Sequence, residues 1–90
     1  MVLYSKLYER EGNDSWLKDY VEIVRNPLGL FLNHTVAHTG WGGDIDEHHR
    51  IKIEIDYDDI KPAQEQINTY LINNSLEDEI IINLEDILYE

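Results

Sequence analysis

The chain has no cysteine among its 90 residues, which excludes a disulfide framework and any metal site built from thiolates. Long apolar runs are also absent, since every run is far shorter than the ~20 residues of a membrane-spanning helix. Residues 1–6 lack the basic region and the apolar stretch of a signal peptide. We therefore expect a cytoplasmic protein with no membrane partner.

Basic residues are scarce: seven Lys and Arg stand against 19 Asp and Glu, for a formal net charge of −12. Residues 1–43 hold five acids and four bases, whereas residues 44–90 hold fourteen acids and three bases. Such a potential repels nucleic acid and anionic membranes, and it raises the encounter rate with a basic surface. Acidity also improves solubility, which accounts for part of the excess. Its asymmetry nevertheless indicates a basic protein partner and no direct binding of nucleic acid.

Composition predicts a folded chain despite this charge. The hydrophobic content of 42% and the six Tyr, two Trp and one Phe exceed what a disordered acidic tail contains. We expect one α+β domain over residues 1–90, with a sheet of three or four mostly antiparallel strands and two helices packed on one face.

Hydrophobic periodicity predicts where the strands lie. Residues 2–8 and 28–36 are rich in β-forming side chains, and residues 50–57 alternate charged and apolar side chains almost throughout. A short apolar run at residues 80–82 is consistent with a central strand. The glycines within residues 37–47 predict a loop.

Two segments have the signals of helices. A cap signal at residues 14–15 precedes helical apolar spacing that ends before Pro27, although residues 20–24 also alternate as a strand would. The second helix is predicted to begin near Pro62 and to end at an Asn pair, residues 73–74. The C-terminal segment fits either a last helical turn or an extended edge.

All four histidines lie within residues 34–50, beside three carboxylates, as the ligands of a transition metal could. His34 and His38 would share one face of a strand, yet about 13 Å apart at ~3.3 Å per residue. His48 and His49 would point to opposite faces. The spacing therefore favours hydrogen-bonding or solvent-exposed histidines over a metal site.

Other catalytic constellations have weaker support. No Gly-rich loop leads into a Lys, and no His partner is evident for Ser5, Ser15 or Ser75. Short acidic pairs could coordinate magnesium, but Asp58 or Asp59 is more readily explained as the capping residue of a turn. We expect no catalytic residue, no metal and no cofactor.

A partner-binding surface is predicted around Trp41, which lies between glycines where no apolar periodicity requires it. A Trp beside carboxylates is typical of an interface anchor, although a Trp can equally fold over a thin core. If residues 44–47 lead into the strand at residues 50–57, seven carboxylates share one surface. The predicted partner-binding residues are Trp41, Asp44, Asp46, Glu47, Glu54, Asp56, Asp58 and Asp59.

These features predict a stoichiometric inhibitor of a basic protein rather than an enzyme. A nuclease is the favoured target, which would make the chain an immunity protein that neutralises a toxin. Acidic side chains on one strand face lie ~6.6 Å apart, near the ~7 Å separation of phosphates along a nucleic-acid strand. A first alternative is therefore a phage anti-defence protein that mimics DNA to block a restriction or CRISPR effector. A second alternative is a small metal-dependent hydrolase that uses the histidine and aspartate segment.

Overall fold

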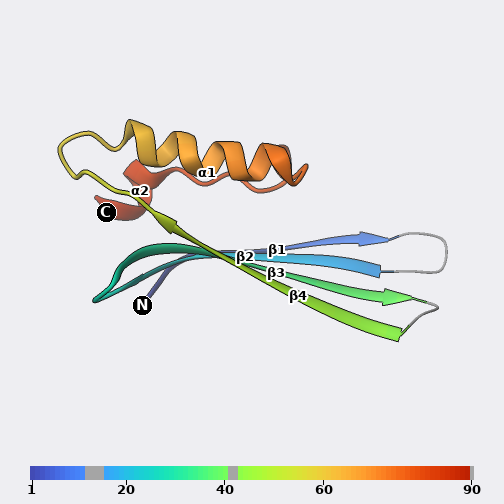
Figure 1. The fold of residues 1–90 in the computed structure, drawn as a ribbon. Helices are drawn as coiled ribbons and strands as arrows, with labels where there is room; N and C mark the ends of the chain where they lie inside the picture. Colours follow the sequence, from blue (N-terminus) through green and yellow to red (C-terminus); the bar gives the residue numbers. More distant parts are fainter. Residues whose placement is uncertain (12–15, 41–42, 90) are drawn as a thin grey trace.

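Four antiparallel strands form one sheet, and the helices follow them in the chain (Figure 1). The computed structural model describes residues 1–11, 16–40 and 43–89. The strands are β1 (Val2–Glu11), β2 (Trp16–Asn26), β3 (Gly29–Gly40) and β4 (Gly43–Ile53), and each pairs with the next. Three consecutive hairpins therefore build the sheet in the order of the sequence.

The helix predicted before Pro27 is wrong, because the segment forms strand β2. Its buried residues Asp19, Val21 and Ile23 alternate with more exposed neighbours, which is the period of a sheet with one covered face. Their β-branched members also favour a strand over a helix. The rival interpretation of residues 20–24 as a strand is confirmed, and the predicted cap lies outside the described residues.

The loop predicted at residues 37–47 is also wrong. β3 continues to Gly40, β4 begins at Gly43, and the two strands pair as far as these glycines. Glycines are common where a tight connection joins two paired strands, so they mark a long hairpin here. The strand predicted at residues 50–57 is part of β4, but β4 begins earlier and ends at Ile53.

Helices α1 (Lys61–Asn73) and α2 (Leu84–Leu88) follow the sheet. Pro62 lies in the first turn of α1 as predicted, and the C-terminal segment resolves into the short helix α2. At the other end of α1, the Leu76 N–H donates to the Leu71 carbonyl at 2.8 Å, and both side chains are buried. This bond and contact close the helix and turn the chain back along it.

The apolar run at residues 80–82 is not a strand, contrary to prediction. Its backbone bonds to a helix side chain instead: Gln64 Nε2 donates to the Ile82 carbonyl at 2.7 Å, and Gln64 Oε1 accepts from the Leu84 N–H at 2.8 Å. One glutamine of α1 thus holds this extended segment beside the helix.

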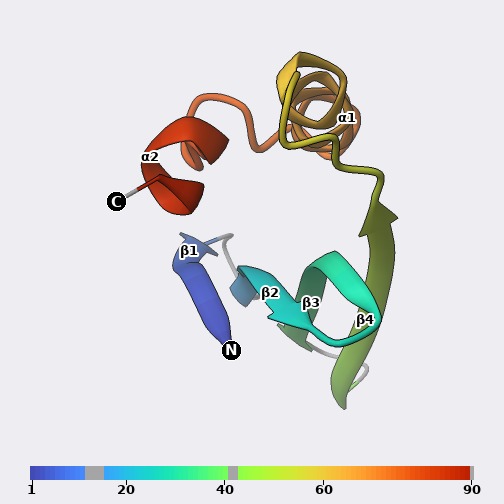
Figure 2. The same cartoon turned by 90° about the vertical axis from the view of Figure 1, so that its left-hand side faces the viewer.

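The molecule has two layers, with α1 on the side of β4 and α2 on the side of β1 (Figure 2). The core between them is formed by Val21, Ile23, Leu30, Leu32, Ile53, Ala63, Ile67, Leu71, Leu76, Ile80, Ile82 and Leu84. The predicted α+β class, with an antiparallel sheet and helices on one face, is confirmed. Neither described helix has the length and apolar character needed to cross a membrane.

Candidate partner-binding surface

Exposed carboxylates cover the helical side of the molecule. Residues 54–89 hold ten acidic residues and a single base, Lys61, and every one of these side chains is exposed. We call the ten the acidic layer: Glu54, Asp56, Asp58, Asp59, Glu65, Glu77, Asp78, Glu79, Glu85 and Asp86. Within the described part of the chain, none of them forms an ion pair. Their charge is therefore not neutralised within the protein.

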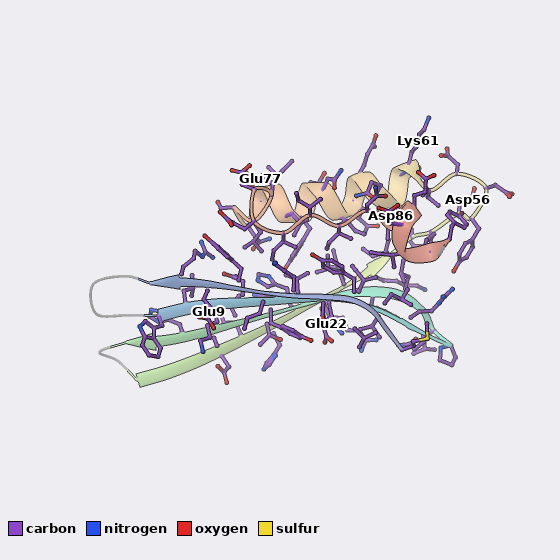
Figure 3. All side chains as sticks on the ribbon, turned by 180° about the vertical axis from the view of Figure 1, so that it is seen from behind. Glu9, Glu22, Asp56, Lys61, Glu77 and Asp86 are labelled. Carbon is purple, nitrogen blue, oxygen red and sulfur yellow. The ribbon has the colours of Figure 1, made fainter. Side chains whose placement is uncertain are left out.

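The opposite face of the sheet is electrically mixed. Glu9 pairs with Lys18 at 3.7 Å, and Arg50 lies over the ring of Phe31 at 4.0 Å from its centroid. Figure 3 shows Glu22 on this face, whereas Asp56, Glu77 and Asp86 lie on the side of the helices. The negative charge is thus concentrated on one layer of the molecule.

The predicted partner-binding residues do not form one continuous region. Asp46 and Glu47 are exposed on β4 near its first residues, whereas Glu54 follows its last residue. At ~3.3 Å per residue, the seven steps from Asp46 to Ile53 span roughly 23 Å. The acidic layer contains Glu54 and the three aspartates that follow it, but not the acids of early β4.

For two of the predicted partner-binding residues, the structure describes the backbone alone or neither backbone nor side chain. Trp41 lies outside the described residues, so its predicted role stays a prediction. Asp44 pairs through its backbone with Thr39, but its side chain is not among those described. The predicted turn role of Asp59 is confirmed, since its carboxylate accepts from the Lys61 N–H at 3.2 Å.

Six acids of the layer were missed by the sequence argument, which followed one strand and stopped before Pro62. They are Glu65, Glu77, Asp78, Glu79, Glu85 and Asp86. The count of fourteen acids after residue 43 already contained them. The sequence did not predict the turn after α1, which returns residues 77–79 to the helical layer.

A buried polar network lies between the sheet and α1. His34 Nε2 lies 2.8 Å from Asp19 Oδ1, and His34 Nδ1 lies 2.7 Å from the Tyr70 hydroxyl. The other Asp19 oxygen accepts from Arg10 Nη2 at 2.6 Å. Asp19 and His34 are each only 2% exposed. Because solvent and substrate have almost no access to either group, this network is suited to holding three strands and a helix together.

The proton positions in the network follow from its acceptors. An ionised Asp19 only accepts, so His34 Nε2 donates to it; in the tautomer whose one proton is on Nε2, Nδ1 accepts from the Tyr70 hydroxyl. Burial raises the pKa of Tyr70 above its ordinary value of 10.0, and the negative charge of Asp19 adds to the rise. The folded protein therefore favours the protonated hydroxyl.

Replacing Tyr70 with Phe should lower the free energy of unfolding by about 1 kcal/mol near neutral pH, the typical value of one hydrogen bond. A group whose pKa is raised by folding stabilises the protein below its ordinary pKa, and that contribution is lost as the pH rises through the folded value. Urea unfolding of both proteins should thus show a gap that narrows above pH ~10. A gap that stays constant across this range would contradict the raised pKa of Tyr70, and the absence of a gap near neutral pH would contradict the assigned hydrogen bond.

The other histidines each have different neighbours among the described residues. His48 lies 3.3 Å from the Thr35 hydroxyl, and His49 lies 3.5 Å from a Glu47 oxygen. His38 lines a shallow hollow with Leu17 and Glu47. No group of three or more potential ligands occurs among the residues that the structure describes. The metal-dependent hydrolase therefore stays a prediction.

Comparison with protein-family models, with curated proteins and with solved structures finds no match. What the protein binds must therefore be inferred from the arrangement of its own side chains.

Proposed function

We propose that the protein is a stoichiometric inhibitor that binds a basic partner protein through its acidic layer. The proposal rests on one observation, the ten exposed carboxylates of residues 54–89, none of which is ion-paired within the described chain. Like charges on one layer repel one another, and a basic partner relieves that repulsion on binding. Binding energy and attraction at a distance come from the same groups.

The class of partner follows from the same charge. A surface that attracts a layer of carboxylates also attracts phosphates, so the favoured partner is a nuclease or another nucleic-acid-binding enzyme. An immunity protein and a phage anti-defence protein both fit this description. The two differ in the target that is blocked, not in the physical basis of binding.

A tagged copy of the protein, incubated with an extract of its native cell, should recover one basic protein at a molar ratio near one to one. The bound protein should be lost as salt rises, because salt screens charge attraction beyond ~8 Å at physiological ionic strength. Mass spectrometry identifies it, and a labelled oligonucleotide then tests whether the inhibitor displaces nucleic acid from it. A recovered partner that is acidic, or one whose binding does not depend on salt, would contradict the proposal.

A further inference from the structure

An apolar groove of about 260 Å³ lies inside the acidic layer, between α1 and the segment that returns along it. It is lined by Asn68, Leu71, Ile72, Glu77, Ile80, Ile81 and Ile82. Two of its side chains are unusually open to solvent for their type, since Ile72 is 57% exposed and Ile81 is 76% exposed. Exposed isoleucines on both walls of one groove form a patch rather than scattered apolar residues.

The local structure fixes both walls of this groove. Ile80 and Ile82 are buried in the core, so the alternation of the extended segment directs Ile81 outward. Gln64 holds this segment to α1 through its bonds at Ile82 and Leu84. The groove is therefore present without any rearrangement, which lowers the entropic cost of filling it.

One carboxylate lines the groove, and other exposed acids lie near its lining residues in the chain. Glu77 lines it, and the exposed Asp78 and Glu79 follow in the chain. Glu65 lies on the same face of α1 as Asn68 and Ile72, at helical spacings of three and seven residues. An apolar centre with a charged rim is the arrangement found in protein interfaces, where the rim directs the partner and the apolar centre adds affinity.

We infer that this groove receives an apolar side chain, such as Leu, Ile or Met, from a segment of the basic partner in which Lys or Arg flanks that side chain. Charge complementarity selects this occupant, because a neutral or acidic apolar segment would leave Glu77 in the lining, and the exposed Asp78 and Glu79 that follow it, without an opposite charge. The inference rests on the proposed function and adds a specific contact to it. The acidic layer attracts any cation, whereas the groove distinguishes among basic segments by the apolar residue they contain.

Two synthetic peptides test the groove directly. The first has Leu at its centre, flanked by Lys and Arg, and the second replaces that Leu with Ser at the same charge. Titration into the ¹⁵N-labelled protein at low salt should show the Leu peptide binding about tenfold more tightly, the value expected for burying one such side chain partly. Its largest amide shifts should lie at Ile72 and Ile81.

The variant Ile72→Ser/Ile81→Ser should remove the preference for the Leu peptide while both peptides still bind. Leu28→Ser is a matched control, because Leu28 is 74% exposed in the turn between β2 and β3 and should leave the preference unchanged. Circular dichroism checks that each variant is folded. Equal binding of the two peptides to the wild-type protein would overturn the groove and leave the acidic layer intact. Failure of both cationic peptides to bind at low salt would overturn both proposals.

Discussion

Replacing Asp19 with Ala should lower the free energy of unfolding by about 3 kcal/mol. The carboxylate accepts from His34 and from Arg10, so its loss leaves two donors without partners. The His34 ring is 2% exposed and cannot turn to water. A buried donor that loses its acceptor costs its full desolvation energy, whereas Arg10, whose side chain is 35% exposed, recovers part of its lost bond from water.

Guanidinium unfolding of the Asp19→Ala variant measures this loss. Glu22→Ala is the matched control, because Glu22 is also an acid of β2 but lies on the face of the sheet away from the helices (Figure 3). Its removal should change stability by less than about 0.5 kcal/mol, as for most surface positions. A loss below about 1 kcal/mol for Asp19→Ala would show that the network contributes little to stability.

Local patterns were enough to predict α1 and most of the strands. Signals such as Pro62 and the alternation in residues 50–57 depend only on residues that are close together in the sequence. β2 was misassigned because a cap signal outweighed a strand pattern that tertiary packing supports. Once residues 16–26 are recognised as a strand, Asp19 stands out, since it lies on the same face as Val21 and Ile23. An acid on the buried face of a strand predicts a carboxylate with hydrogen-bond partners in the core.

The partners of Asp19 could not be predicted from the sequence. Arg10, Asp19, His34 and Tyr70 come from four different elements, and only the sheet register and the packing of α1 bring them together. The charge excess of the C-terminal half could be read from residue counts, but its position on one layer could not. That position depends on the turn at Leu76, which places residues 77–79 next to α1.

The position of the acids, rather than their number, should decide whether the partner binds. The variant Glu65→Lys/Asp78→Lys/Glu79→Lys changes three exposed acids of the acidic layer. Each replacement raises the net charge by two, so the three together change it from −12 to −6. We expect it to weaken binding of the recovered partner by about 100-fold or more at low salt, because three attractions become repulsions. The salt dependence of the affinity should fall as well. Its stability should be unchanged or higher, since repulsion within the layer decreases.

The matched control is Glu9→Lys/Glu22→Lys/Asp46→Lys, which reaches the same net charge of −6 through acids of the opposite sheet face. Long-range attraction falls equally in both variants, so the control should lose only a few-fold in affinity, mainly through slower association. Isothermal titration of both variants over a range of salt concentrations separates the two effects. Equal losses in the two variants would mean that net charge alone governs the encounter and that the acidic layer is not the binding surface. A larger loss in the control would place the interface on the open face of the sheet.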